Sequence, residues 1–184
     1  MKDESYFKET GISHEMIYDG KVLHVCKDKI RLPNGRESMR EYCLHNGAVA
    51  VVALTDDNEV ICVRQYRYAV GAVTTEIPAG KLDHKDESPI EAALRELREE
   101  TGYRCKKITH IGDLLSSPAI LTEVIHMYFA EGRIPGDTDP DDDEFLELVK
   151  IPLCELKRMI IDGEIRDAKT QAAVLKVAEM LEKK

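Results

Sequence analysis

The chain has 184 residues, 43% of them hydrophobic, and a formal net charge of −9. This length suits one domain with a full core, or a domain with a short appendage. The negative charge argues against a nucleic acid as partner, because binding its phosphates requires a basic surface.

The first part of the chain is predicted to consist of β-strands. Residues 21–31 alternate apolar and polar side chains, and after a Pro-Asn-Gly turn residues 37–44 return as a second strand. Residues 47–54 form a dense apolar run that ends in an Asp-Asp-Asn turn, and residues 60–64 follow it. We therefore predict a second hairpin from these two runs.

The rest of the chain is predicted to mix helices and strands. Residues 132–143 hold two Pro and several Asp, which is typical of a surface loop. Because strands come first and dominate, we predict the α+β class with a mixed central sheet. The further elements predicted are strands at 108–114, 125–131 and 144–151, and helices at 152–161 and, capped by Asp167, at 168–181.

One more helix has marked ends. Ser88 suits the N-cap, Pro89 the first helical position and Glu91 the reciprocal partner in a capping box. Gly102 suits the left-handed residue just past the helix. The apolar stripe that we expect to face the core consists of Ile90, Ala93, Leu94 and Leu97.

Three carboxylates share a face at the end of this helix. Glu96, Glu99 and Glu100 stand at i, i+3 and i+4, where like charges repel by about 0.2–0.5 kcal/mol per pair. The helix dipole disfavours each anion in the last turn by about 0.3–1 kcal/mol. One interpretation is a solvated acidic face partly neutralised by Arg95 and Arg98. The other is a site for a hard cation, Mg²⁺ or Mn²⁺, which prefers oxygen ligands.

These residues stand in an order that resembles the Nudix box, G-x5-E-x7-R-E-U-x-E-E-x-G-U with U apolar. That box is the signature of hydrolases that cleave nucleoside diphosphates linked to another moiety, so the resemblance favours the metal site. Two positions depart from it: six residues instead of five separate Gly80 from Glu87, and Tyr103 replaces an aliphatic residue. The matching positions are Gly80, Glu87, Arg95, Glu96, Leu97, Glu99, Glu100 and Gly102.

Other segments resemble the ADP-ribose pyrophosphatases within this family. They are the run at 76–81, the Gln-Tyr-Arg at 65–67, Ser117-Pro118 with Glu123, the acidic loop at 143–145, and residues 167–170. Ala119 stands where that subfamily carries a glycine. The resemblance implies a Nudix α/β/α sandwich over 46–184. It also implies an N-terminal antiparallel β segment, residues 1–45, that exchanges with a second subunit in a homodimer.

The resemblance also implies a cofactor and its ligands. The cofactor is Mg²⁺, for which Mn²⁺ can substitute. The side-chain ligands are Glu96, Glu99 and Glu100, and the backbone carbonyl of Ala79 is a further ligand. Cations of this kind stabilise charge on phosphoryl oxygens and lower the pKa of bound water.

Catalytic roles are implied for Glu144, Glu99 and Arg95. Similar enzymes carry a glutamate on the loop before a late strand, and that residue positions or deprotonates the attacking water. Glu144 occupies this place, with Asp142 and Asp143 as alternatives in the same loop.

Four residues are predicted to bind substrate. Arg67 is expected to contact a phosphate, since a guanidinium matches phosphate geometry, although a salt bridge would explain it too. Glu123 is expected to accept hydrogen bonds from the terminal ribose, and Glu76 to contact substrate or pair with a basic residue. Arg40 is expected to reach the adenosine across a dimer.

We therefore predict Mg²⁺-dependent hydrolysis of the diphosphate of ADP-ribose to AMP and ribose 5-phosphate. Another nucleoside diphosphate sugar, such as GDP-mannose, stays an alternative, because the metal site is indifferent to base and sugar. A Nudix domain that binds ADP-ribose without catalysis is a second alternative, which the complete box disfavours. The predicted partners are a small nucleotide-sugar and a second copy of the chain, without nucleic acid or membrane.

Cysteine and histidine usage bears on compartment and metals. The five cysteines are scattered without a CxxC pair, which indicates buried thiols rather than disulfides or zinc. The six histidines show no ligand spacing, and none is assigned to a metal. No stretch approaches the ~18 apolar residues of a membrane span, and residues 1–5 lack the apolar run of a signal peptide. We expect a cytoplasmic protein.

Overall fold

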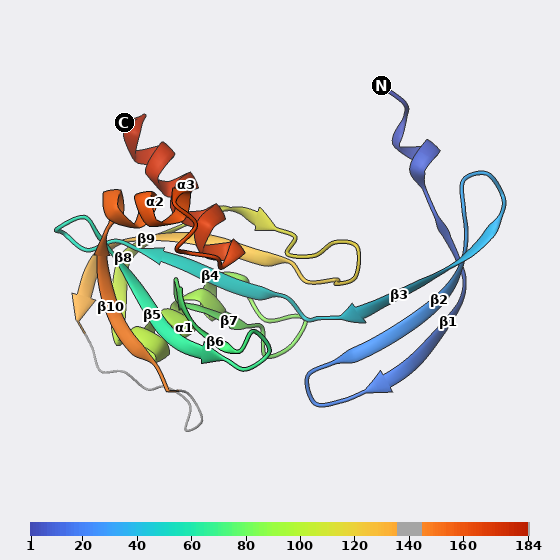
Figure 1. Cartoon of the computed structure of the whole chain (residues 1–184), viewed down its shortest axis with the longest axis horizontal. Coiled ribbons are helices and arrows are strands. Elements are labelled where there is room, and N and C mark those ends of the chain that lie inside the picture. Colours follow the sequence, from blue (N-terminus) through green and yellow to red (C-terminus); the bar gives the residue numbers. More distant parts are fainter. Residues whose placement is uncertain (136–144, 184) are drawn as a thin grey trace. The chain divides into compact units, whose positions relative to one another are not determined.

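The computed structural model describes residues 1–135 and 145–183. The chain divides into two compact units, which are described one at a time (Figure 1). The first unit consists of Met1–His45 and Ser117–Glu123, and the second of Asn46–Ser116 and Val124–Lys184. The segment 1–45 lies in the first unit together with seven residues that the sequence did not associate with it, and its exchange between two subunits stays a prediction.

The first unit is built on a three-stranded antiparallel sheet with the order β1-β2-β3. The two predicted strands are present as β2 and β3, whereas β1 was not predicted. Every residue of β1 is exposed, and Cys26 and Ile30 are the only buried residues of this fully described unit. The elements are a 3₁₀ turn at Glu4–Phe7, β1 (Thr10–Asp19), β2 (His24–Arg31) and β3 (Glu37–Leu44).

The segment Ser117–Glu123 joins the first unit through the end of β3. The amide of Cys43 donates to the carbonyl of Ile120 at 2.8 Å, and the amide of Thr122 donates to the carbonyl of Cys43 at 3.1 Å. The amide of His45 donates to Thr122 Oγ1 at 2.9 Å. These bonds hold the segment that carries Glu123 against residues far away in the sequence.

The centre of the second unit is a mixed four-stranded sheet with the order β7-β4-β9-β8, in which β4 and β9 run parallel. All six residues of β4 are buried. Both of its faces are covered, as expected for a continuous apolar run. The strands are β4 (Ala48–Ala53), β7 (Ala79–Lys81), β8 (Tyr103–Leu114) and β9 (Ile125–Pro135).

Helices cover both faces of this sheet, which confirms the predicted α/β/α layers. On one face Val49 and Val51 of β4 pack with Leu97 of α1 (Pro89–Thr101). On the other face Ala50 and Val52 share a core cluster with α2 (Leu153–Ile161) and α3 (Ala168–Glu182). Asp167 caps α3 as predicted, since its Oδ2 accepts the Thr170 amide at 2.9 Å.

The predicted second hairpin is wrong. Residues 47–54 and 60–64 form β4 and β5, but these strands belong to different sheets and share only an isolated bridge between Leu54 and Val60. Both edges of β4 are occupied by β7 and β9, so no edge is left for β5. A second sheet with the order β10-β5-β6 holds β5 (Glu59–Arg67), β6 (Ala72–Glu76) and β10 (Glu147–Pro152).

The helix α1 begins and ends as predicted, but two details differ. The Ser88 side chain makes no capping hydrogen bond. The buried stripe is also rotated, since Ile90 and Leu94 are 43% and 40% exposed while Ala92 is fully buried. The small Ala92 and Ala93 side chains pack against the sheet, and the turn that follows buries Glu100.

Two smaller expectations also need correction. The loop predicted at 132–143 begins later, because β9 stays paired with β8 through Pro135. The cysteines are all free, as predicted, but Cys26 and Cys62 alone are buried and Cys154 is exposed.

Candidate active site

The backbone of β7 and the side chains of α1 approach each other unusually closely at Gly80. A Cβ added to Gly80 would lie 2.0 Å from both Cδ and Oε1 of Glu96. No real Cβ tolerates such a contact, so the Glu96 carboxylate occupies the space that any other residue at position 80 would fill. Any other residue at position 80 would therefore require the flexible Glu96 side chain to move.

Glu100 lies one turn further along α1 and is only 6% exposed. Its Oε2 accepts a hydrogen bond from the amide of Ala79 at 3.0 Å. The backbone beside Gly80 thus orients one carboxylate while Gly80 makes room for another. A carboxylate buried at the C-terminal end of a helix is unfavourable in itself, because the helix dipole places negative charge there.

Arg95 holds the carboxylates around it in place. Its Nη1 donates to Glu96 Oε1 at 2.7 Å and to Glu99 Oε2 at 3.2 Å, and its Nη2 donates to Glu87 Oε1 at 3.2 Å. Burial by itself would lower the pKa of Arg95, but the negative charge of Glu96 and the hydrogen bonds to Glu96 and Glu99 outweigh it and raise that pKa. Glu87 also accepts the amide of Asp83 at 2.6 Å, which closes the loop before α1.

The acidic cluster of α1, which we define as Glu87, Glu96, Glu99 and Glu100, carries more negative charge than its arginines neutralise. Arg95 and Arg98, which donates to Glu99 Oε1 at 3.0 Å, supply two positive charges against these four carboxylates. Oxygen donors that are already ordered and partly buried fit Mg²⁺ or Mn²⁺.

Glu76, in contrast, is surrounded by basic groups. Arg67 donates to both of its oxygens, at 2.8 and 2.7 Å, and Lys169 forms an ion pair with Oε2. Thr74 Oγ1 donates to Oε1 at 2.6 Å. Burial would raise the pKa of Glu76, but the hydrogen bond from Arg67 and the charge of Lys169 outweigh it and lower that pKa to about 2.

For Arg67 and Glu76 the structure therefore shows the salt bridge that the sequence left as an alternative. The pair is not isolated from the acidic cluster. The hydrogen bond to Glu76 is the main cause that raises the pKa of Arg67, and the charge of Glu100 contributes as well. Residues 76–79 thus carry one carboxylate that pairs with Arg67 and one amide that binds Glu100.

The remaining predicted site residues belong to the first unit or lie outside the described residues. Arg40 and Glu123 belong to the first unit, where the Arg40 Nε donates to Glu9 Oε2 at 3.0 Å and Glu123 Oε1 lies 3.7 Å from His45 Nε2. Glu144 lies outside the described residues, as do Asp142 and Asp143. Their predicted roles stay predictions.

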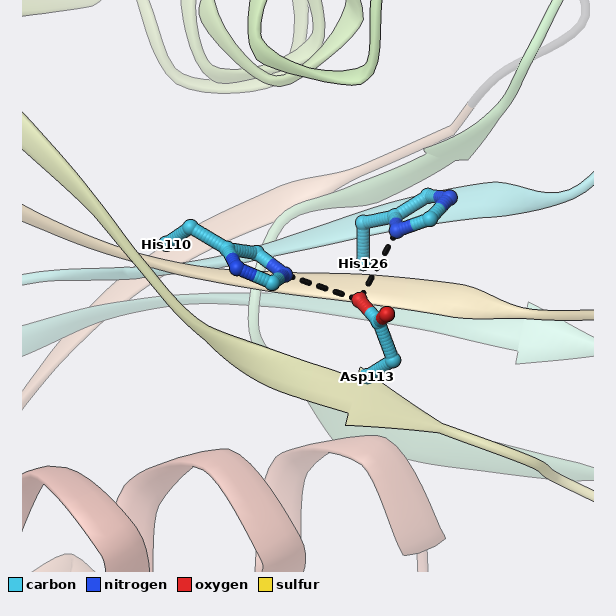
Figure 2. Close-up of side chains that lie close together, drawn as sticks. All are labelled: His110, Asp113 and His126. Atoms are coloured by element: carbon cyan, nitrogen blue, oxygen red, sulfur yellow. Dashed lines mark hydrogen bonds and ion pairs between the residues drawn. The ribbon is translucent and has the colours of Figure 1, made fainter.

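The structure also brings together residues to which the sequence analysis gave no role. Lys169 is one, and the helix-start pattern at 167–170 could have drawn attention to it. Within residues 1–135 and 145–183, one set of three potential metal ligands has its ligand atoms all within 4.8 Å of one another: His110, Asp113 and His126 (Figure 2). They come from paired positions on β8 and β9, which no spacing along the sequence reveals.

Comparison with known proteins agrees with the box and the fold. The NUDIX domain profile matches residues 44–174. The chain belongs to the Nudix family. It is 41% identical over 169 residues to an ADP-ribose pyrophosphatase of Bacillus subtilis strain 168, covering 91% of each chain. It is also 41% identical over 182 residues to a methanol dehydrogenase activator of Bacillus methanolicus, covering 97% of this chain and 98% of that one.

The fold of this Nudix protein extends over nearly all of a solved structure. The crystal structure of an ADP compounds hydrolase matches it with a TM-score of 0.86 at 26% identity, covering 98% of this chain and 97% of that one. None of the helices in the described part of the chain has the length and apolar character needed to cross a membrane.

Proposed function

We propose that this Nudix hydrolase cleaves the diphosphate of ADP-ribose to AMP and ribose 5-phosphate with Mg²⁺ as cofactor. The observation that carries the proposal is the acidic cluster of α1, whose carboxylates are held by Arg95, Arg98 and the Ala79 amide beside Gly80. Because Mn²⁺ has the same preference for oxygen ligands, it can take the place of Mg²⁺. The similarity to proteins named for hydrolysis of ADP-ribose and ADP compounds supports the substrate class.

The chain contributes ligands, their orientation and a base. Glu96, Glu99 and Glu100, with the carbonyl of Ala79, would hold the cation, which when bound stabilises charge on the phosphoryl oxygens and acidifies water. Arg95 keeps Glu96 and Glu99 on one side of the helix by bonding both. We assign the base that takes the proton from the attacking water to Glu144.

The residues that we propose to bind substrate form two groups. Arg67 uses Nε and Nη2 for Glu76, and 43% of its side chain stays exposed, so Glu76 can hold it while it contacts a phosphate. Glu123 and Arg40 lie in the first unit. We assign Glu123 to the terminal ribose and Arg40 to the adenosine side, contributed across a dimer.

The alternative substrate is another nucleoside diphosphate sugar such as GDP-mannose. The carboxylates of α1 act on the diphosphate, which these substrates share, and they give no preference for one base or sugar. A domain that binds ADP-ribose without hydrolysing it would not need four ordered carboxylates with an excess of negative charge. We therefore place catalysis ahead of simple binding.

The experiment that tests this function compares kcat/KM for ADP-ribose, GDP-mannose, UDP-glucose, NADH and diadenosine phosphates. ADP-ribose is expected to be among the best substrates, with AMP and ribose 5-phosphate as products. Removing the metal with EDTA is expected to abolish turnover, and Mg²⁺ to restore it. Poor hydrolysis of ADP-ribose relative to the others would overturn the substrate assignment, and activity without metal would overturn the mechanism.

We also propose that the protein works as a homodimer in the cytoplasm. The first unit buries only two residues of its own, so its three-stranded sheet has almost no apolar core. It exposes a set of large apolar side chains that a second subunit would cover. These side chains are Ile12, Met16, Ile17, Tyr18, Val22 and Leu23. Sedimentation equilibrium measures the mass of the protein in solution, and the mass of a single chain would contradict the homodimer. Five free cysteines agree with a reducing compartment.

A further inference from the structure

Two histidines and an aspartate converge on the second unit, apart from the acidic cluster of α1. His110 Nε2 and His126 Nδ1 each lie 2.8 Å from the same oxygen, Oδ1 of Asp113. Figure 2 shows both rings directed at that carboxylate, one from β8 and one from β9. The side chains of His110 and Asp113 are about half exposed, at 48% and 49%, and that of His126 is 25% exposed.

A break in the strand makes this convergence possible. In a regular strand, residues three apart such as His110 and Asp113 point to opposite faces of the sheet. Here β8 carries a bulge, because His110 pairs with Tyr128 and Asp113 pairs with His126, while Gly112 pairs with Met127. The extra residue brings His110 and Asp113 to the same face. Gly112 has a φ of 129°, which favours glycine.

The ligand atoms of these three side chains all lie within 4.8 Å of one another, which is close enough for the three side chains to bind one metal ion together. Two imidazoles and one carboxylate are the donor set of Zn²⁺ and neighbouring transition metals, with coordination positions left open to water. We propose that His110, Asp113 and His126 bind one Zn²⁺-class transition-metal ion, at a site separate from the Mg²⁺ site. The inference needs neither the proposed substrate nor the proposed reaction.

The pairing of the strands places the two sites on one face of the sheet. Gly80 of β7 pairs with Val49 of β4, Val49 pairs with His126 of β9, and His126 pairs with Asp113 of β8. Val49 packs with α1, so this row faces the helix that carries the acidic cluster. With strands about 4.8 Å apart, His126 lies about 10 Å from Gly80 along the row. The two sets of ligands thus belong to different positions along this row of the sheet.

The two sites also differ in the metal ion that their ligand atoms prefer. Mg²⁺ takes oxygen ligands and coordinates imidazole poorly, whereas Zn²⁺ readily takes imidazole nitrogen. Excess Mg²⁺ should therefore occupy the acidic cluster and leave the histidine site to the transition metal. Binding requires a nitrogen lone pair on each ring in place of the N–H that now faces Asp113, so the tautomers must change or protons must leave.

The rival explanation is an ordinary surface network of hydrogen bonds between histidine and aspartate. The first unit contains such a pair, His14 and Asp28, with Nδ1 2.7 Å from Oδ1. That aspartate accepts its other hydrogen bond from the Tyr42 hydroxyl at 3.0 Å and not from a second imidazole. His14 is thus a matched control, a histidine bonded to an aspartate but without the third ligand.

The test is calorimetric titration of the full chain with Zn²⁺ in the presence of excess Mg²⁺. The unaltered protein is expected to bind one Zn²⁺ per chain. His126→Ala and Asp113→Asn are each expected to weaken that binding at least about tenfold, since even partners of metal ligands contribute 10–100-fold. His14→Ala is expected to bind as the unaltered protein does. Equal binding by the unaltered protein and His126→Ala would overturn the proposal, as would no binding by the unaltered protein.

A second measurement guards against loss of fold and against Zn²⁺ at other residues. Metal-free His126→Ala should melt within a few degrees of the unaltered protein by circular dichroism, because the His126 side chain lies outside the buried core. Co²⁺ added with excess Mg²⁺ should give visible d–d absorption that changes in His126→Ala and persists in His14→Ala. Identical Co²⁺ spectra for all three proteins would place the ion elsewhere and reject the site.

Discussion

The second unit contains two networks of charged side chains that differ in their charge balance. Around Glu76, the two cations Arg67 and Lys169 meet two carboxylates, since Lys169 also contacts Asp167 at 3.0 Å. Around Arg95, two guanidiniums meet the four carboxylates of the acidic cluster. The first network has as many cations as carboxylates, whereas in the second the carboxylates outnumber the arginines.

This difference distinguishes a balanced ion-pair network from the cluster that we propose as the metal site. Both networks contain buried carboxylates, Glu76 at 2% and Glu100 at 6% exposed. A buried anion is tolerated when it is paired and hydrogen-bonded, as Glu76 is. In the acidic cluster the carboxylates outnumber the arginines that bond them. The ratio of carboxylates to basic groups therefore favours the acidic cluster as the proposed metal site more clearly than burial does.

The largest expected effect comes from removing the charge of one carboxylate in the acidic cluster. Glu100→Gln is expected to lower kcat for ADP-ribose by about 1,000-fold, or about 4 kcal/mol in the barrier. The amide of glutamine can still accept the bond from Ala79, so the melting temperature should change little. The measurement is the steady-state rate at saturating Mg²⁺ together with thermal melting.

Glu91→Gln is the matched control for that variant. Glu91 lies on the same helix and is exposed, and the substitution removes the same charge. Its rate should stay within about twofold of the unaltered protein, because it touches none of the four carboxylates. If Glu91→Gln and Glu100→Gln lost activity equally, general charge on α1 would explain the loss, and Glu100 would leave the proposed ligand set.

For the network around Glu76, we expect loss of charge to change the stability of the fold instead of catalysis. Burial would raise the pKa of Glu76, but Arg67 and Lys169 lower it from 4.5 to about 2. A carboxylate whose pKa is lowered by folding stabilises the fold above its unfolded pKa. That contribution is lost as the pH falls from about 4.5 to 2. At neutral pH the shift of the Glu76 pKa contributes on the order of 3 kcal/mol to the free energy of unfolding.

Glu76→Gln is accordingly expected to destabilise the protein by about 3 kcal/mol at pH 7 and by much less near pH 2. Denaturant unfolding at several pH values measures this, with Glu59→Gln, on the neighbouring strand β5, as control. Equal destabilisation at both ends of the pH range would show that the charge of Glu76 is not what stabilises the fold.

Local sequence patterns were enough to predict much of the acidic cluster. Pro89 and Gly102 mark the ends of α1, and the spacing of Glu96, Glu99 and Glu100 places them together on any helix. These are properties of consecutive residues, and the structure keeps them. The rotation of the buried stripe was missed, because it depends on how closely Ala92 and Ala93 approach the sheet.

Features that depend on strand pairing could not be predicted in the same way. The hairpin expected from residues 47–64 fails because β4 is paired on both edges by strands distant in the sequence. The histidine site depends on the register of β8 with β9 and on a bulge that reverses which face His110 occupies. Neither register nor bulge follows from the spacing of His110, Asp113 and His126 alone.

The smallest expected effect tests how the position of the Glu96 carboxylate depends on Gly80. In Gly80→Ala the new methyl group would lie 2.0 Å from the Glu96 carboxylate, so the flexible Glu96 side chain must move. We expect Mg²⁺ to bind about tenfold more weakly, because ligands displaced by about an ångström no longer fit its strict octahedral geometry. Mg²⁺ titration of activity measures the change. Gly11→Ala, where nothing lies within 4 Å, is the control.

The cause of that change can be isolated with a double variant. If Gly80→Ala acts by displacing the Glu96 carboxylate, it should cost nothing further in a Glu96→Ala background, where there is no carboxylate to displace. The coupling between the two substitutions should then equal the whole effect of Gly80→Ala on Mg²⁺ affinity. Additive losses would instead mean that the methyl group disturbs the strand β7 itself. The close approach of Gly80 would then concern packing of the strand rather than the position of the Glu96 carboxylate.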